Sequence, residues 1–356
     1  MLRSIGRVML VAGGLHTCSA LADPGDTAPC PMSPSIHEIP IIEGRMAIGL
    51  YNPPANRSGI DIRVPITFHV IRRSDGTGGP IESEIELALD SANSLWSESG
   101  IQFCKPGATI EHLSDELYNN TDTLSEVNEL RSMDQVPDTI NVYFVNNLRI
   151  EIGSICGISS FTTSAVQGIA VDNGCLPHTG NPSTFAHELA HYFDLYHTHE
   201  PAFGDECTDG LNCDIAGDLV CDTPADPNVR GEVSPGDCVW NGNDQPDCGE
   251  GPYTPPVRNV MSYSPSTCRD ELTPMQTGRA LATLINLRPE LVANACDPCP
   301  NIADVNGDIA LTPADFTAWL DAFNTQSPSA EQNGDGVITP TDYTARITNF
   351  NAGCLG

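Results

Sequence analysis

The segment His-Glu-Leu-Ala-His-Tyr-Phe-Asp-Leu-Tyr-His, which begins at His187, is the strongest signal in this chain. Residues four apart lie on one face of an α-helix, so His187 and His191 can offer ring nitrogens to one metal ion, with Glu188 beside them. A third ligand at His197 requires the helix to stop and the chain to turn back. Asp194 stands where that turn must occur, and Asp tolerates left-handed backbone better than most non-Gly residues.

This spacing predicts a zinc site with a general base. Zinc prefers three neutral imidazole nitrogens and leaves its fourth position to water, whose pKa falls to roughly 7. Glu188 can then act as general base on that water. His199 is an alternative third ligand to His197. The other interpretation is that these are unrelated residues of one helix, and a third His at the right offset disfavours it.

The N-terminus predicts export. Arg3 and Arg7 precede a short apolar run, and Ala20-Leu21-Ala22 is typical of a signal-peptide cleavage site, which makes residues 1–22 a signal peptide. The run is too short to span a membrane, which needs roughly 20 apolar residues. A lipoprotein signal at Cys18 is an alternative. Of 14 Cys, 13 remain after Cys18, so we expect disulfides and a secreted or cell-surface location.

The excess of acidic residues disfavours some classes of binding partner. The chain has 47 Asp+Glu against 16 Lys+Arg, a formal net charge of -31. Such a surface repels phosphate backbones and anionic lipid, so we expect no nucleic-acid partner and no membrane-surface partner. The short apolar run leads us to expect no membrane span either.

The hydrophobic pattern predicts an α/β or α+β domain between residues 59 and 295. Strand-like alternation begins at Ile62, helical spacing follows it, and further strands precede the helix of the histidine motif. Residues 23–58, rich in Pro, Gly and Ser, suit a pro-segment or linker. Residues 200–256 are irregular and Cys-rich, so we expect disulfides to hold them. Either residues 157–161 or residues 168–172 form the upper rim of the cleft, where an edge strand would hold an extended peptide.

Downstream lies Asn259-Val-Met261-Ser-Tyr263, in which Met261 taken alone would be a core residue and Tyr263 a surface one. After a three-His motif the segment resembles the second half of the metzincin signature, which implies a turn whose Met forms an apolar floor under the ligands. Tyr263 would then approach the metal or the oxyanion of a tetrahedral intermediate. The chain resembles the pappalysin group of metzincins over roughly residues 60 to 292. The motifs that carry this resemblance are His187 to Thr198, Gly217 to Pro224, Asn259 to Cys268 and Leu272 to Gln276.

The resemblance implies a zinc endopeptidase with a mixed sheet and a disulfide-rich irregular C-terminal subdomain. It implies that His187, His191 and His197 are the zinc ligands, that Glu188 is the base and that Met261 lies in the Met turn. It also implies a disulfide between Cys248 and Cys268. One departure is Asp194, where the metzincin pattern has Gly. Such zymogens can be kept latent by a pro-segment Cys, and Cys30 is the candidate; a pro-segment disulfide at Cys30 is the alternative. Arg45 and Arg57 are candidate processing points.

The C-terminal tail carries a repeat of period 27, in which Leu311-Thr-Pro-Ala-Asp-Phe-Thr-Ala recurs from Ile338. Residues 299–354 resemble a dockerin, a paired Ca²⁺-loop module that would be small and all-α, and whose partner would be a cohesin-like or cell-surface receptor. Two positions depart from the Ca²⁺-loop pattern: Ile309 replaces the usual Gly of the first loop, and Glu331 replaces the usual Asp of the second. The alternative interpretation of the tail is a pair of acidic turns that bind no Ca²⁺. Cys299 and Cys354 bracket the module and can tie its ends. The expected Ca²⁺ ligands are Asp304, Asn306, Asp308, Asp315, Glu331, Asn333, Asp335 and Asp342.

Two other functions compete with the endopeptidase. One is a calcium-dependent extracellular binding protein whose peptidase-like domain binds zinc without turnover; the presence of Glu188 argues against it. The other is a zinc hydrolase with non-peptide substrates, against which the Met-containing turn argues by analogy. The interpretation as a peptidase predicts a protein or peptide substrate.

Overall fold

The computed structural model describes residues 30–55, 57, 60–116, 121–176, 183–293, 302–306 and 313–352. The expected signal peptide, together with Cys299, Asp308 and Cys354, lies outside these residues. None of the helices in the described ranges is long and apolar enough to cross a bilayer.

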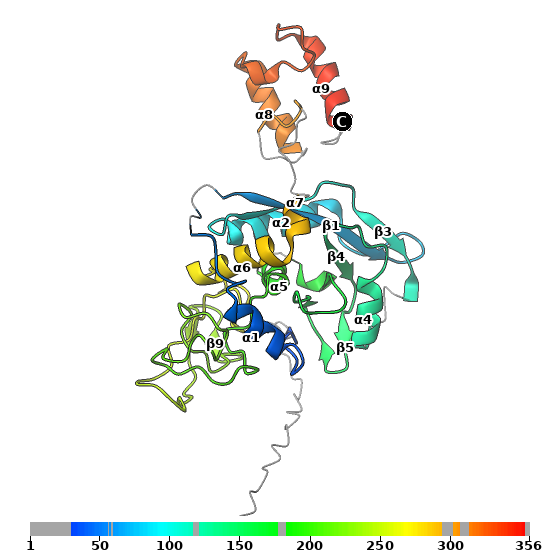
Figure 1. The fold of residues 1–356 in the computed structure, drawn as a ribbon. Helices are drawn as coiled ribbons and strands as arrows, with labels where there is room; N and C mark the ends of the chain where they lie inside the picture. The colour runs from blue at the N-terminus through cyan, green and yellow to red at the C-terminus, as the bar shows by residue number, and fades with distance from the viewer. Residues whose placement is uncertain are drawn as a thin grey trace, which may run out of the picture.

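A six-stranded sheet in the order β2-β1-β4-β8-β7, with β3 also paired to β1, forms the centre of the main domain, residues 60–293 (Figure 1). The pairs are parallel except β7 with β8, which is antiparallel. Strand β7 is therefore the edge next to β8. The strands are β1 (Ile62–Arg72), β2 (Ile101–Cys104), β3 (Ile110–Leu113), β4 (Ile140–Val145), β7 (Gly157–Ile158) and β8 (Ile169–Asp172).

Both faces of the sheet are covered, because alternate residues of a strand point to opposite faces. In β4, Val142 and Phe144 belong to the core beneath helices α2 (Glu82–Trp96), α5 (Thr184–Tyr192) and α6 (Pro274–Leu287). Tyr143 and Val145 belong to the opposite core, which includes residues of α4 (Leu124–Arg131). Burial on both faces explains why β4 is buried along its whole length and apolar except at Asn141. The structure confirms the mixed α/β class.

Helix α6 begins with a capping box, in which Thr273 accepts a hydrogen bond from the Gln276 N–H and Gln276 accepts one from the Thr273 N–H. A shorter helix, α7 (Pro289–Ala293), follows it. The remaining regular elements are short: β5 (Arg149–Ile150), β6 (Gly153–Ser154), β9 (Val233–Ser234), β10 (Val239–Trp240) and the 3₁₀ turn η1 (Asn173–Cys175).

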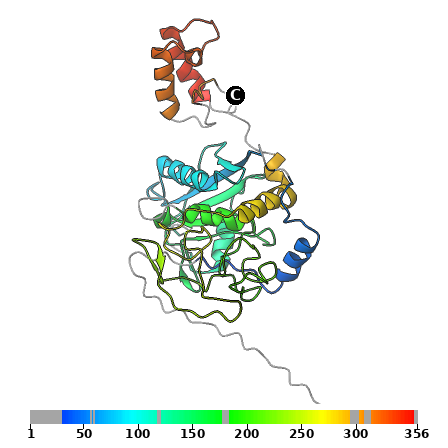
Figure 2. The same ribbon diagram turned by 90° about the vertical axis from the view of Figure 1, so that its left-hand side faces the viewer.

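The segment before β1 forms helix α1 (Ile39–Ala47), which packs against the main domain (Figure 2). Ile42 of α1 and Tyr51 share a buried cluster with Phe161, Tyr196 and Leu219. The expected pro-segment therefore has an ordered, docked part.

Four disulfides join described residues: Cys156–Cys175, Cys207–Cys248, Cys213–Cys221 and Cys238–Cys268. The expected Cys248–Cys268 pairing is wrong. Cys238 and Cys268 share a small buried cluster with Val229 and Val233, which brings them together. Cys248 pairs instead with Cys207, and the neighbouring Thr208 N–H donates to the Cys248 carbonyl at 3.3 Å.

The tail holds two helices, α8 (Pro313–Asn324) and α9 (Pro340–Ala352), with the 3₁₀ turn η2 (Pro328–Ala330) between them (Figure 1). Trp319 is buried in their small core, and its indole N–H donates to the Ala330 carbonyl at 2.9 Å. This accords with the expected small all-α tail.

Candidate active site

Helix α5 brings two histidines of the motif to one point. The Nδ1 of His187 donates to the Val260 carbonyl at 2.7 Å, and the Nδ1 of His191 donates to the Leu195 carbonyl at 2.8 Å. A neutral imidazole that donates from Nδ1 carries a lone pair on Nε2. The two Nε2 atoms nevertheless lie 3.1 Å apart, and the Nε2 of His197 lies 3.1 Å from that of His191.

This donor set fits a metal ion. Two ring lone pairs that face each other at 3.1 Å repel unless a cation lies between them. Burial lowers the pKa of His191 to about 3 and lowers the pKa values of His187 and His197 well below the ordinary range, so the rings are neutral as metal ligands must be. One group of described residues can hold a metal, and it consists of Cys30 and these three histidines. His199, the alternative third ligand, is not a member.

The turn after α5 depends on Asp194. Its φ is +57°, in the left-handed region expected for the position. Its buried carboxylate accepts hydrogen bonds from the Thr162 N–H at 2.8 Å and the Tyr51 hydroxyl at 2.9 Å, and its carbonyl accepts one from Arg279 Nε at 2.9 Å. The Asp that departs from the family pattern therefore makes the turn and also supplies a polar anchor for it.

Glu188 lies against the edge strand. A Cβ atom added to Gly157 of β7 would come within 2.5 to 2.6 Å of the Glu188 side chain, so only Gly allows this close approach. Burial raises the pKa of Glu188 to about 8, while the Cys30 hydrogen bond, Arg269 and Arg131 lower it. Glu188 and the edge strand β7 are thus in direct contact.

Met261 and Tyr263 lie in a turn that contacts the end of the histidine motif. Met261 is fully buried, and its carbonyl accepts a hydrogen bond from the N–H of Thr198, the residue after the third histidine. The Met261 N–H donates to Asn259 Oδ1 at 2.9 Å, and Asn259 in turn pairs with Gln276 of α6. The Tyr263 ring centroid lies 4.6 Å from that of His197. Helix α6 therefore fixes the turn beneath the ligands.

Cys30 occupies the same point from the other side of the cleft. Its thiol lies within 4.8 Å of the three histidine donor atoms and 3.6 Å from Glu188 Oε2, and the Tyr263 hydroxyl donates to the Cys30 carbonyl. Burial, and then the negative charge of Glu188, raise the pKa of this thiol. Cys30 is the free cysteine among the described residues, which rules out the alternative of a pro-segment disulfide within them.

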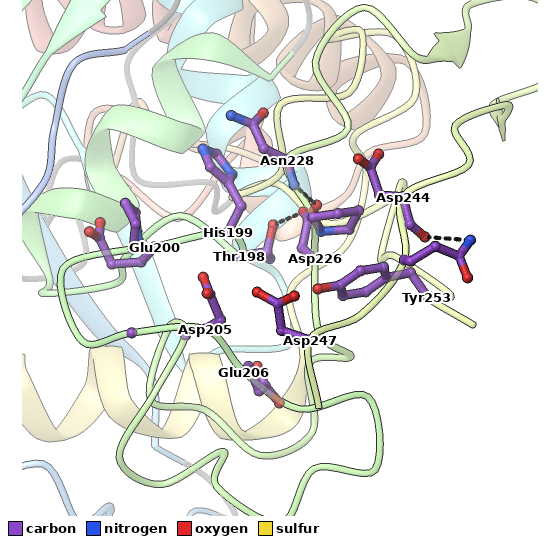
Figure 3. A pocket seen from close by; sticks show the side chains of 15 residues that line it. Thr198, His199, Glu200, Asp205, Glu206, Asp226, Asn228, Asp244, Asp247 and Tyr253 are labelled. Carbon is purple, nitrogen blue, oxygen red and sulfur yellow. Dashed lines mark hydrogen bonds between the residues drawn. The ribbon is translucent and has the colours of Figure 1, made fainter. Parts of the chain in front are cut away.

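An acidic cavity of about 330 Å³ follows the third histidine (Figure 3). Thr198 lines it and donates to Asp226 Oδ2 at 2.5 Å. Burial raises the pKa of Glu206 to about 7 and that of Asp226 to about 6. The residues that line it include no Lys or Arg, and its carboxylates come from Glu200, Asp205, Glu206, Asp226, Asp244 and Asp247.

No sequence motif pointed to the two buried arginines near Glu188, Arg131 and Arg269. Arg131 of α4 donates to the Ser159 carbonyl at 2.8 Å and to the Gly168 carbonyl at 3.1 Å, which joins the ends of β7 and β8. Arg269 lies 3.5 Å from His187 Nδ1. Lone arginines carry no motif, so only the fold identifies them.

In the tail, the described candidates for Ca²⁺ binding make local hydrogen bonds. Asp315 accepts from the Val305 N–H at 3.0 Å, and Asp342 accepts from the N–H groups of Gln332 and Thr339, each at 2.8 Å. Glu331 Oε1 accepts from the Asn333 N–H at 3.0 Å. These contacts organise the two loops around the side chains at position 12. The candidates within the described ranges are Asp304, Asn306, Asp315, Glu331, Asn333, Asp335 and Asp342.

Comparison with known proteins supports this geometry. The family model described as pregnancy-associated plasma protein-A matches residues 137–284, which include α5 and the Met261 turn. An extracellular metalloprotease of Colletotrichum graminicola is 30% identical over 233 residues, which cover 61% of this chain and 74% of the relative. One of Verticillium alfalfae is 26% identical over 267 residues, covering 72% of this chain and 89% of the relative.

A solved structure of a promirolysin mutant from Tannerella forsythia shares the fold, with a TM-score of 0.50 at 18% identity, over 74% of this chain and 97% of that chain. The catalytic region thus has the metzincin-type fold that the sequence predicted. The relatives named as extracellular agree with the disulfides of the described residues. The chain belongs to the pregnancy-associated plasma protein-A family of metalloproteases.

Proposed function

We propose that this chain is a secreted zinc endopeptidase made as a zymogen, with a signal peptide at 1–22, a pro-segment at 23–58, a catalytic domain at 59–295 and a calcium-binding tail at 299–354. One observation carries the catalytic part of the proposal. The Nε2 atoms of His187, His191 and His197 face one point with neighbouring separations of 3.1 Å, and Glu188 stands beside them.

The three histidines hold zinc, which when bound supplies a Lewis acid that acidifies water and polarises a carbonyl. Glu188 accepts a proton from the attacking water and passes it to the leaving amine. Tyr263 donates a hydrogen bond from its hydroxyl to the oxyanion of the tetrahedral intermediate. Its hydroxyl now donates to the carbonyl of Cys30, an acceptor of the same chemical type, which supports this role.

Strand β7 holds the backbone of the substrate. Of the two segments considered for the rim, β8 lies between β4 and β7, whereas β7 is the edge strand. An extended peptide that pairs with β7 would pass directly over Glu188, because Gly157 lies in contact with that side chain. Strand addition binds a peptide largely irrespective of its sequence.

Cys30 holds the zymogen latent. Its thiol occupies the position next to the three histidines, its carbonyl engages Tyr263, and its Sγ contacts Glu188, so one residue engages the metal site, the oxyanion donor and the base. Further contacts support docking, since Ser33 donates to Glu200 at 2.5 Å and Thr163 donates to Glu38 at 2.6 Å.

Processing after Arg57 would release this segment. Arg57 is exposed, which makes it accessible to a processing protease. Arg45, the other candidate, lies within α1 and donates to Thr162 at 2.6 Å while it pairs with Asp194 at 3.8 Å. A side chain that anchors the docked helix is a poor processing site, so Arg57 is favoured.

The tail binds Ca²⁺ through its two loops and docks the enzyme on a cohesin-like or cell-surface receptor. Asp315 and Asp342 each stand at the start of a helix and accept hydrogen bonds from their own loop, which supports two equivalent units. Calorimetric titration of the chelated full chain with Ca²⁺ tests this, with the Asp315→Asn/Asp342→Asn double variant as control. Heat of binding that persists unchanged in the double variant would contradict the assignment.

The catalytic proposal is tested by cleavage of an unfolded protein with the processed enzyme. Activity should disappear after chelation, return with added zinc, and be absent from Glu188→Ala. Glu250→Gln, a change at an exposed carboxylate, is the matched control and should retain activity. If the processed, zinc-loaded enzyme cuts no faster than Glu188→Ala, the alternative of a catalytically silent, calcium-dependent binding protein replaces the proposal.

A further inference from the structure

Arg269 is a buried cation with almost no partners. It is 6% exposed, and no carboxylate of the described residues lies within ion-pair distance of it. A guanidinium carries five N–H donors. Nη1 donates to the Ser262 carbonyl at 3.3 Å, Nη1 also lies 3.5 Å from His187 Nδ1, and the buried Nε has no partner. Because His187 Nδ1 already donates to Val260, it cannot accept from Arg269.

The other buried arginines of the catalytic region are better satisfied. Arg131 donates to Ser159, Ser160, Gly168 and Asn128. Arg279 donates to the Asp194 carbonyl, and its guanidinium lies 4.2 Å from the Tyr51 ring centroid. Arg288 donates to the Tyr192 carbonyl and lies 3.5 Å from the ring centroid of the same residue. Arg131 Nε and Arg279 Nη2 are also buried without a hydrogen-bond partner, but each of these side chains has other close contacts. Arg269 differs in having one long hydrogen bond and no ring of a described residue beneath it, and such a buried charge costs stability unless a ligand completes its contacts.

The location of Arg269 indicates that a ligand completing its contacts would belong to the substrate. Its two contacts are His187, the first histidine of the metal site, and Ser262, which lies between Met261 and Tyr263. Its charge acts on Glu188, Cys30 and Tyr263, the groups that surround the reacting bond in the proposed function. The guanidinium thus lies on the Nδ1 side of the first histidine and beside the turn that carries Met261 and Tyr263.

The cavity that follows the third histidine has the opposite charge. Its lining includes six carboxylates, all labelled in Figure 3. With a formal net charge of -31, the chain as a whole repels acidic substrates. A local buried cation is what allows an acidic side chain to enter at one position of the cleft.

We propose that Arg269 is a specificity-determining residue that binds the carboxylate of an Asp or Glu side chain of the substrate adjacent to the scissile bond. A carboxylate matches the guanidinium with two parallel hydrogen bonds and satisfies donors that the protein leaves free. This inference rests on the proposed peptidase function, and it assigns a substrate class to the same site.

The test compares peptide pairs that differ only by Glu or Gln, placed in turn on each side of the scissile bond. All peptides are C-terminally amidated, and a further pair compares the amide with a free C-terminal carboxylate. The processed wild-type enzyme should cleave the Glu peptide about 10- to 100-fold more efficiently in kcat/KM at one position, the effect of one charge-assisted contact. A preference only for the free C-terminal carboxylate would overturn the side-chain proposal.

Arg269→Met should bring the Glu to Gln ratio to about 1, and Arg269→Lys should keep part of the preference. Arg258→Met is the matched control, because it removes the same charge from an exposed ion pair with Asp270 and should leave the ratio unchanged. If Arg269 only compensates the charge of Glu188, Arg269→Met should cleave the Glu peptide and the Gln peptide more slowly by the same factor. The Glu to Gln ratio of kcat/KM would then persist, and this result would overturn the proposal.

Two further measurements separate this inference from folding and from the proposed function. Arg269→Met should unfold at the same or a higher temperature, because replacing an unpaired buried charge with an apolar side chain is neutral or stabilising; a large decrease would assign Arg269 a structural role and overturn the proposal. If the wild type cleaves nothing, the peptidase function fails, and the same peptide pairs are then compared by Kd on Glu188→Gln. Equal Kd values would overturn the inference separately.

Discussion

The hydroxyl of Tyr51 donates a hydrogen bond to the carboxylate of Asp194 at 2.9 Å, which joins the segment before β1 to the turn between the second and third histidines. Asp194 is buried, and Arg45 of α1 lies 3.8 Å from the same carboxylate. The side chain that replaces the expected Gly in this turn therefore also connects the metal site to the segment that covers it.

Tyr51→Phe should destabilise the zymogen by about 1 to 2 kcal/mol, because a buried hydrogen bond to a charged acceptor is lost while Asp194 stays buried. Chemical denaturation of the unprocessed chain measures the loss. Tyr343→Phe, at an exposed tyrosine of the tail, is the control and should change stability little. A zymogen of unchanged stability would show that Thr162 alone satisfies Asp194.

Gly157→Ala should reduce kcat/KM by about 10- to 100-fold, since the added Cβ would come 2.5 Å from Glu188 and must displace either the base or the rim strand. The reduction in kcat/KM is measured by steady-state cleavage of a peptide with the processed enzyme. Gly236→Ala is the control, because a Cβ at Gly236 meets no atom within 4 Å. Equal activity of both variants would refute direct contact between β7 and the base.

Glu206→Gln should stabilise the protein at pH 8 and have little effect at pH 5. Burial raises the pKa of Glu206 to about 7 from the ordinary 4.5, so the folded state favours the neutral acid. Stability from such a group is complete below the unfolded pKa and is lost as the pH rises through about 7. The glutamine variant avoids this loss, with a gain of about 1 to 3 kcal/mol at pH 8.

Unfolding temperatures of both proteins at pH 5 and pH 8, without added divalent cations, measure this difference. Glu250→Gln changes an exposed carboxylate and should show no pH-dependent gain. A stability change in Glu206→Gln that is the same at both pH values would contradict the raised pKa.

Cys30→Ser should make the unprocessed chain active, by roughly tenfold or more over the wild-type zymogen, as expected if the thiol contributes at least about 1.4 kcal/mol to pro-segment binding. Residual inhibition should remain, because Ser33, Glu38 and Arg45 keep their contacts with the catalytic region. The double variant with Glu188→Gln should be inactive. If Cys30→Ser stays as latent as the wild type, those contacts alone cover the site.

The histidine motif was readable from the sequence because its geometry is local. Helical spacing places His187 and His191 on one face, and the left-handed turn at Asp194 follows from the need for a third ligand. The alternation that begins at Ile62 likewise predicted the strand β1, since successive side chains of a strand point to opposite faces whatever the rest of the chain does.

Only the tertiary structure decided contacts between segments far apart in the chain. The pairing of Cys268 with Cys238 rather than Cys248, the choice of β7 over β8 as the edge, and the approach of Cys30 to Glu188 all depend on how separate segments pack. The burial of Arg269 beside His187 is of the same kind. Spacing along a chain determines which residues share a face of one element, whereas packing between elements determines which charges are left without partners.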